Sequence, residues 1–270
     1  FRGNLTFARN KILEYDEVPQ NYPWMNMTGS RLNSWNLYIA EGLYTFDDFD
    51  VTVDEQGIKH YTLKSGLPVS TLGSTEPGDI KLKDLNEDGV IDANDQTRYA
   101  ADPQNPELVY GFGLNVDYKG FYASIFFQGA GNTSTVLGQA NGPGFHPFAW
   151  GDRTSGTRIQ ALNRWTEENP SQNVLYPRLH SSSNFNNRAA STWWLRDASF
   201  LRLKNLEVGY NFPSKIAKKM AMQAARVYLM GYNIAVWDHI GLWDPEMGNK
   251  NDGMAYPLSR TFTLGVEFTF

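Results

Sequence analysis

The stretch Asp84–Asp95, which reads DLNEDGVIDAND, is the one place where residue types and spacing predict a specific chemistry. Asp84, Asn86 and Asp88 occupy positions 1, 3 and 5 of the calcium-loop pattern, where side-chain oxygens converge on the ion. Val90 stands at position 7 and would add its backbone carbonyl oxygen. Because a hard cation needs several oxygens around it, this stretch predicts a calcium site.

Three further positions refine the prediction. Gly89 provides the sharp turn at position 6, and Ile91 is expected to pack inward. Asp95 stands at position 12, where an EF-hand loop carries a bidentate glutamate, so the loop is expected to bind calcium more weakly. The alternative is an acidic turn that holds no metal. The expected role of the ion is to stiffen an external loop, without any part in catalysis.

No other pattern indicates catalysis, because the sequence has no nucleophile elbow, phosphate loop or catalytic triad motif. A glycoside hydrolase would need two carboxylates flanking a cleft, and nothing marks such a pair. The four histidines show no ligand spacing and are expected to be solvated loop side chains: His60, His146, His180 and His239. We therefore expect a protein that is not an enzyme.

Aromatic side chains gather in or beside the long polar segments, where flat rings could stack on sugars or contact a partner protein: Phe145, Phe148, Trp150, Trp193, Trp194, Trp237 and Trp243. Trp193 and Trp194 are expected to belong to an aromatic girdle at a membrane interface. Trp150 and Trp243 are the candidates for binding a substrate or a partner.

The composition favours many strands and turns. The 270 residues include 14% aromatics and 24 glycines, with only 20% charged residues. The absence of cysteine excludes disulfides and cysteine-based zinc sites. A net charge of -5 argues against a nucleic-acid partner. No run of 18 apolar residues predicts a transmembrane helix, which leaves open a membrane barrel built from short alternating segments.

Strict alternation identifies the strands. In the last segment, Leu258–Phe270, the residues alternate from Phe262 onward: those of one parity are all apolar, and those of the other include threonines and a glutamate. The hairpin Glu107–Gln128 repeats this pattern on both of its strands, with the two-residue turn Lys119-Gly120 between them. In a soluble sandwich such strands are half-buried, whereas in an outer-membrane barrel the apolar side faces lipid and the polar side faces the lumen.

We predict an all-β fold with about seven long strands, in which short turns lie at one end and long loops at the other, as in outer-membrane barrels. The predicted strands are residues 2–12, 33–46, 107–118, 121–128, 196–212, 225–236 and 258–270. Residues 47–107 form one predicted extracellular loop that contains the calcium loop 84–95, and residues 129–192 form another. Seven strands would leave open edges in lipid, so the chain 1–270 is expected to be the closing part of a larger barrel.

Several segments resemble the C-terminal region of SusC/RagA-type TonB-dependent outer-membrane transporters. They are GNLTFARNK (3–11), PGDIK (77–81) running into the calcium loop, FLRLKNL (200–206), GYNI (231–234), DPE (244–246) and the terminal Phe270. The motifs cover nearly the whole chain and occur in the order of that family.

The resemblance implies a 22-stranded barrel in the outer membrane, of the size whose lumen is plugged. The plug domain and the remaining N-terminal barrel, which this chain lacks, would contact the TonB complex and couple uptake to the proton gradient. A SusD-like surface lipoprotein would cover the external loops, and the imported substrate would be an oligosaccharide or a peptide. The alternative interpretation is a calcium-stabilised, β-rich carbohydrate-binding module at the cell surface.

Overall fold

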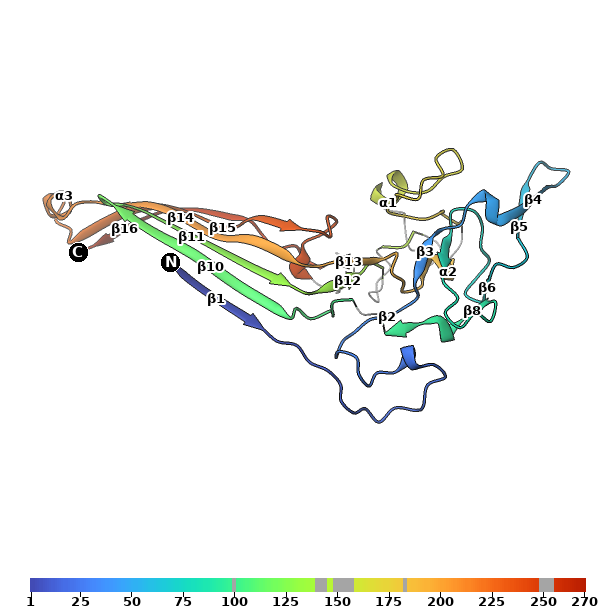
Figure 1. The fold of residues 1–270 in the computed structure, drawn as a ribbon. Helices are drawn as coiled ribbons and strands as arrows, with labels where there is room; N and C mark the ends of the chain where they lie inside the picture. The colour runs from blue at the N-terminus through green and yellow to red at the C-terminus, as the bar shows by residue number, and fades with distance from the viewer. Residues whose placement is uncertain (99–100, 139–144, 148–157, 182–183, 248–254) are drawn as a thin grey trace.

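The structure is a computed structural model that describes residues 1–98, 101–138, 145–147, 158–181, 184–247 and 255–270. It consists of a long sheet and a head, which lies at one end of the sheet (Figure 1). The sheet contains six antiparallel strands in the order β1-β10-β11-β14-β15-β16. Their bounds are β1 Arg2–Phe7, β10 Leu108–Tyr118, β11 Phe121–Gly131, β14 Phe200–Asn211, β15 Ala224–Asp238 and β16 Thr261–Thr269.

The connections between neighbouring strands alternate in length, as predicted. The turn 119–120 and the segment 212–223, which contains the helix α3 (Ser214–Lys219), lie at one end of the sheet. The long connections 8–107, 132–199 and 239–260 leave from the other end and build the head. The C-terminus lies near α3, whereas the N-terminus lies partway along the sheet beside the middle of β10 (Figure 1).

The predicted strand over residues 33–46 is wrong. That stretch contains the short strands β2 (Asn36–Leu37) and β3 (Ala40–Leu43), which pair with β9 (Thr97–Arg98) and β7 (Ile80–Leu82) in the head. Its apolar residues supply the core of the head instead of a row on the sheet. The sheet therefore has six strands in the described part of the chain, and β1 runs toward the head.

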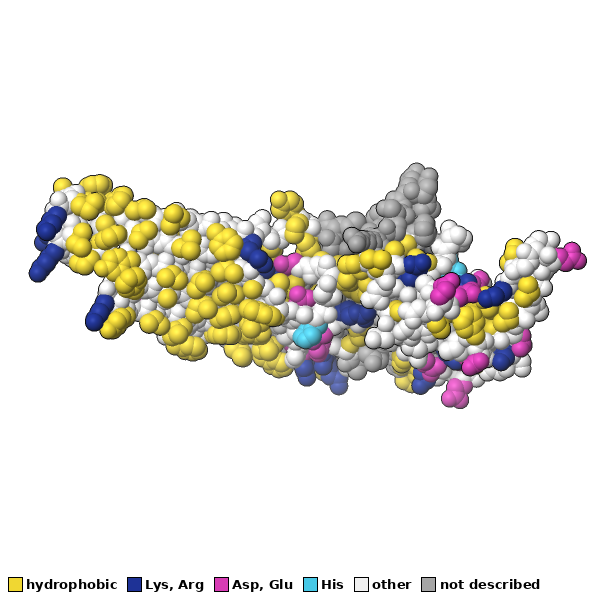
Figure 2. All heavy atoms as spheres, turned by 90° about the horizontal axis from the view of Figure 1, so that it is seen from above, with side chains coloured by type: hydrophobic (Ala, Val, Ile, Leu, Met, Phe, Trp, Pro, Cys, Tyr) yellow, Lys and Arg dark blue, Asp and Glu magenta, His cyan; other side chains and the backbone are white. Residues whose placement is uncertain are grey.

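The two faces of the sheet differ as the alternation predicted. On one face the apolar residues of all six strands form continuous rows, because the register pairs Leu114 with Ile125 and Leu229 with Leu264. These rows are exposed: Leu264 is 74% and Phe262 64% accessible. The space-filling view shows a broad hydrophobic surface over this part of the molecule (Figure 2). The rows thus do not meet in a compact interior.

The opposite face carries polar side chains that contact one another across the strands. Tyr122 donates a hydrogen bond to Glu207 Oε1 at 2.7 Å, and Arg226 Nη2 lies 2.7 Å from Glu267 Oε2. The sheet therefore presents one apolar and one polar face, and the described residues cover little of either.

Short elements build the head. They include the hairpin β4 (Phe49–Val53) and β5 (Lys59–Leu63), β6 (Val69–Ser70), β8 (Val90–Ile91), β12 (Ser134–Val136), β13 (Leu195–Asp197), α1 (Arg158–Leu162) and α2 (Phe185–Arg188). None of the described helices is long and apolar enough to cross a membrane.

The head has its own hydrophobic core, drawn from segments far apart in the chain: Trp35, Leu37, Tyr38, Leu43, Ile80, Leu82, Ile91, Val136, Leu137, Phe145, Trp165, Tyr176 and Trp194. The predicted loops 47–107 and 129–192 therefore contribute to a packed core in their described parts.

Candidate functional site

The backbone of the predicted calcium loop has the expected shape. Gly89 adopts a φ of +87°, a conformation that glycine tolerates better than other residues, at the position that needs the sharp turn. Ile91 is fully buried and belongs to β8, which pairs in parallel with β6. These two predicted features are confirmed.

The carboxylates of the loop accept hydrogen bonds from its own backbone. Asp84 accepts from the N–H groups of Glu87 and Gly89, both at 2.8 Å. Asp95 is fully buried and accepts from Leu85 at 2.7 Å and Asp92 at 2.8 Å. Burial raises the pKa of Asp95, and the negative charges of Asp84 and Asp92 add to the rise, while its hydrogen bonds oppose it.

This geometry meets one requirement of a calcium site but not another. Each carboxylate oxygen that accepts one N–H keeps a further lone pair for a cation. However, among the described residues no three side chains of His, Cys, Asp or Glu lie close enough together to hold a metal. Asp84, Asn86, Asp88 and Asp95 would therefore have to move inward to surround an ion together with the Val90 carbonyl.

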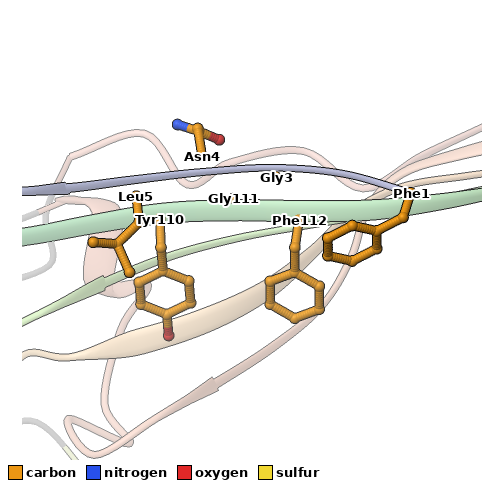
Figure 3. A pocket seen from close by; sticks show the side chains of 7 residues that line it. All are labelled: Phe1, Gly3, Asn4, Leu5, Tyr110, Gly111 and Phe112. Carbon is orange, nitrogen blue, oxygen red and sulfur yellow. The ribbon is translucent and has the colours of Figure 1, made fainter.

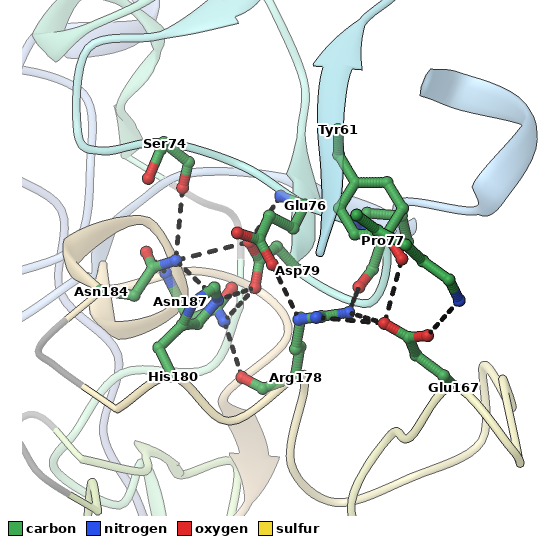
Figure 4. A network of polar contacts seen from close by, with 11 residues as sticks. Tyr61, Ser74, Glu76, Pro77, Asp79, Glu167, Arg178, His180, Asn184 and Asn187 are labelled. Carbon is green, nitrogen blue, oxygen red and sulfur yellow. Dashed lines mark hydrogen bonds and ion pairs between the residues drawn. The ribbon is translucent and has the colours of Figure 1, made fainter. Parts of the chain in front are cut away.

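The segment just before this loop is fixed to the head by a buried network around Asp79 (Figure 4). Asp79 is fully buried, and its Oδ1 lies 2.6 Å from His180 Nε2 and accepts a hydrogen bond from Asn187 Nδ2 at 2.7 Å. Its Oδ2 accepts from the Glu76 backbone N–H at 2.8 Å. Although burial lowers the pKa of His180, the hydrogen bond and charge of Asp79 outweigh that effect, so the pKa is raised.

Arg178 completes this network next to Asp79 (Figure 4). Its guanidinium forms ion pairs with Glu76 at 3.0 Å and Glu167 at 3.2 Å, and it lies 5.5 Å from the ring centroid of Trp165. Trp165 in turn packs so closely on Gly78 that a Cβ there would come within 2.3 Å of the ring. The motif PGDIK thus has a structural role that orients the start of the predicted calcium loop.

A second site lies on the polar face where the sheet meets the head. It is a pocket of about 580 Å³, whose lining includes Gln104, Gln128, Phe200 and Glu246. Next to it the buried Arg202 holds Asp244 and Glu246, each at 2.5 Å. The motif DPE therefore attaches the segment after β15 to the polar face of the sheet.

A third, open groove runs along the edge strand β1 (Figure 3). Its volume is about 370 Å³, and it is lined by Phe1, Gly3, Asn4, Leu5, Tyr110, Gly111 and Phe112. Leu5 is 69% accessible, and the aromatic rings of Tyr110 and Phe112 lie beside it along the groove (Figure 3). The groove is part of the exposed apolar face and contains no charged lining side chain.

The structure changes the interpretation of the tryptophans. Trp194 is fully buried in the core of the head and donates to the Asn187 carbonyl at 2.9 Å, and Trp193 packs beside that core. The predicted girdle role of these two residues is therefore wrong. Trp243 is partly buried against the same core, 6.1 Å from the ring of Phe145, and Trp150 lies outside the described residues.

Two histidines are not the solvated loop side chains that were expected. His180 belongs to the network around Asp79, and its side chain is 18% accessible. His146 is buried, with Nδ1 3.1 Å from the Tyr176 hydroxyl, and burial lowers its pKa to about 3. Sequence spacing gave no signal for either contact, because Asp79 and His180 are 101 residues apart.

No family model matches the chain. Three curated relatives from Formosa agariphila do match it, and each is named as a TonB-dependent receptor. P26 is 32% identical over 225 residues, P3 is 27% identical over 210 residues, and P39 is 24% identical over 281 residues. The alignments cover 77%, 73% and 96% of this chain but 22%, 20% and 26% of the relatives. The chain thus spans about a quarter or less of their length.

Solved structures of RagAB share the fold. The RagAB peptide transporter matches with a TM-score of 0.64 at 22% identity, over 99% of this chain and 26% of that chain. The RagAB peptide importer in its closed-closed state matches with a TM-score of 0.63 at 23% identity, over 99% and 27%.

Proposed function

The chain belongs to the SusC/RagA family of TonB-dependent receptors, and we propose that it forms an arc of the barrel wall, with the external head, of a nutrient importer in the outer membrane. The observation that carries this proposal is the exposed apolar face of the six-stranded sheet, opposite a polar face. In a barrel wall the apolar face contacts lipid and the polar face lines the lumen.

The short-turn end would face the periplasm and the head would face outside. Strands of 11 or more residues, such as β10 and β15, are long enough to cross the hydrocarbon core at a tilt. The other strands of a 22-stranded barrel and the plug would lie in the part of the receptor that this chain does not span. Through that plug the TonB complex would energise uptake.

The names of the relatives and of the structural neighbours describe receptors and transporters, which supports transport without enzymatic catalysis. We propose that the substrate is an oligosaccharide or a peptide, captured together with a SusD-like surface lipoprotein over the head. The pocket of about 580 Å³ would open to the lumen, because Gln128 and Glu246 line it on the polar face.

We further propose that calcium binds Asp84, Asn86, Asp88, the Val90 carbonyl and Asp95 and stiffens the head. The turn at Gly89 and the buried Ile91 support this, and the carboxylates would close around the ion when it binds. Calorimetric titration of the intact receptor with calcium tests it: an Asp84→Ala variant is expected to lose the binding isotherm.

A pair of substitutions on neighbouring residues of β16 tests the orientation of the wall. Leu264→Lys places a charge on the apolar face, and Thr263→Lys places the same charge on the polar face. A lipid-facing lysine near the midplane costs about 2–4 kcal/mol. In the intact receptor we therefore expect Leu264→Lys to reduce heat-modifiable, membrane-inserted protein and Thr263→Lys to leave it unchanged. Equal tolerance of both would refute the proposal.

A further inference from the structure

The helix α3, at the end of the sheet opposite the head, concentrates positive charge. Its lysines Lys215, Lys218 and Lys219 are all exposed. Lys119, in the other turn at this end, lies 5.1 Å from the ring centroid of Tyr118. Figure 2 shows dark blue side chains at this tip, beyond the hydrophobic surface, with no acidic side chain among them on that face.

The same helix also exposes apolar side chains. Ile216, within the helix, is 46% accessible, and Met220, its C-cap residue, is 60% accessible. Their spacing of four residues brings them to the same side of the turn. Ala217 lies on another side and is fully buried, in a small cluster with Met222 and Ala225. The helix thus packs through its alanine, while its lysines and its larger apolar side chains are left to the surroundings.

The apolar side chains of α3 continue the exposed face of the sheet. Phe212, which immediately precedes Pro213 and the helix, is 37% accessible, and its N–H donates to the Ala225 carbonyl. Phe268 on β16, the partner of Ala225, is 49% accessible. A surface that binds the apolar rows of the sheet would therefore also reach Ile216 and Met220.

No acidic partner explains the lysines. Within the described part of the chain, none of Lys215, Lys218 and Lys219 forms an ion pair. Lys218 and Lys219 stand in the last turn of the helix, where a positive charge interacts favourably with the helix dipole. That interaction affects only the stability of the helix, and it does not explain Lys215, which lies in the first turn.

We propose that α3 binds the phosphates of anionic phospholipids in the membrane leaflet at the short-turn end, with Ile216 and Met220 inserted among the acyl chains. The proposal rests on the proposed membrane location of the sheet. Lysines next to a membrane surface attract anionic headgroups, by a factor of about five per lysine. Apolar side chains that extend the lipid-facing surface favour a lipid over a soluble anion or a protein as the ligand.

Native mass spectrometry of the intact receptor tests the proposal. The receptor is purified in detergent and incubated with equimolar phosphatidylglycerol and phosphatidylcholine that carry the same acyl chains. We expect the receptor to retain more phosphatidylglycerol than phosphatidylcholine. The triple substitution Lys215→Gln, Lys218→Gln and Lys219→Gln should reduce that preference at least fivefold. The same substitutions to arginine should preserve it, and high salt should weaken it in the unchanged receptor.

A matched control removes three exposed lysines elsewhere that form no ion pair among the described residues, through Lys11→Gln, Lys64→Gln and Lys83→Gln. This variant should keep the preference for phosphatidylglycerol. An unchanged preference in the α3 variant, or an equal loss in the control, would overturn the proposal. If the lysines had a purely structural role, the α3 variant would lose thermal stability equally in both lipids. That result would also overturn the proposal. Failure of the wall proposal is distinguishable, because the unchanged receptor would then retain neither lipid.

Discussion

Tyr228 and Gly265 are direct partners across β15 and β16, and the tyrosine ring lies so close over the glycine that a Cβ there would come within 2.2 Å of Cζ. The same relationship joins Tyr122 to Gly209 and Tyr110 to Gly129 in other strand pairs. An aromatic ring that covers a cross-strand glycine compensates for the missing side chain and helps to fix the register.

Gly265→Ala is therefore expected to destabilise the sheet, because the new methyl group would displace the ring of Tyr228. Overpacking of this kind typically costs about 1–3 kcal/mol. Urea titration of the intact receptor, followed by the shift between its folded and unfolded bands on a gel, measures the change. Gly3→Ala is the control, since a Cβ on Gly3 meets its nearest neighbour at an ordinary 3.5 Å. Equal losses in the two variants would contradict the explanation.

Arg202 is predicted to hold the segment after β15 on the polar face. Arg202→Ala would leave Asp244 without its ion-pair partner and Glu246 with only the longer 3.7 Å contact to Lys204, in a mostly buried site. Such a change costs about 2–4 kcal/mol after allowance for the partial exposure of the two carboxylates. Hydrogen exchange of residues 239–247 in the intact receptor should become faster.

Arg226→Ala is the matched control for Arg202, because it breaks an ion pair with Glu267 whose side chains are 41% and 55% accessible. An exposed pair contributes about 0–1 kcal/mol, so exchange in residues 239–247 should not change. Equally slow exchange in the Arg202→Ala and Arg226→Ala variants would show that the ion pairs of Arg202 do not hold this segment on the sheet.

Local alternation was enough to predict most of the sheet. The hairpin on either side of Lys119-Gly120 and the last strand were found because a period of two specifies both the strand and its two faces. The prediction failed for residues 33–46, where Leu37 and Leu43 share one parity but are buried in the head. Alternation cannot distinguish a lipid-facing row from a row that packs on a core.

The contacts of the head could not be predicted, because they join segments about 100 residues apart. Trp35 donates to Ser134, and Asp79 pairs with His180. One sequence alone carries no record of such pairs. The turn within the predicted calcium loop was predictable for the opposite reason, since the pattern lies within twelve consecutive positions and Gly89 fixes the turn.

His180 is predicted to make the stability of the head depend on pH. The pKa of His180 is raised in the folded state by the hydrogen bond and charge of Asp79 and by the charge of Glu76, against the effects of burial and of Arg178. A histidine whose pKa is higher in the folded than in the unfolded state stabilises the folded protein when it is protonated. This contribution is complete below the pKa of the unfolded state, about 6.5 for histidine, and it is lost as the pH rises through the pKa of the folded state.

Limited proteolysis of the intact receptor across this range measures the effect. Cleavage within the head should become faster as the pH rises through the folded pKa of His180, and His180→Gln should remove that dependence. His60→Gln is the control, because His60 is exposed and pairs with Asp54 at the hairpin β4–β5, away from Asp79. If cleavage of the His180→Gln variant still depended on pH, another titrating group would be responsible.

Calcium is predicted to protect the segment 84–95 from protease. Asp84, Asp88 and Asp95 carry negative charges in one short loop, and an ion that binds them would fix a backbone that is otherwise held by its own N–H groups. Chelation should therefore expose the loop to cleavage in the intact receptor, and added calcium should restore protection.

Asp84→Ala should make the loop equally sensitive with and without calcium, because it removes the ligand at position 1. Asp50→Ala is the control, since Asp50 lies on β4, outside the loop, and should leave calcium protection intact. Asp95→Glu supplies the longer carboxylate that usually closes such loops, so it should lower the calcium concentration needed for protection. Identical cleavage patterns for chelated, calcium-loaded and Asp84→Ala receptor would show that the acidic turn holds its shape without a metal.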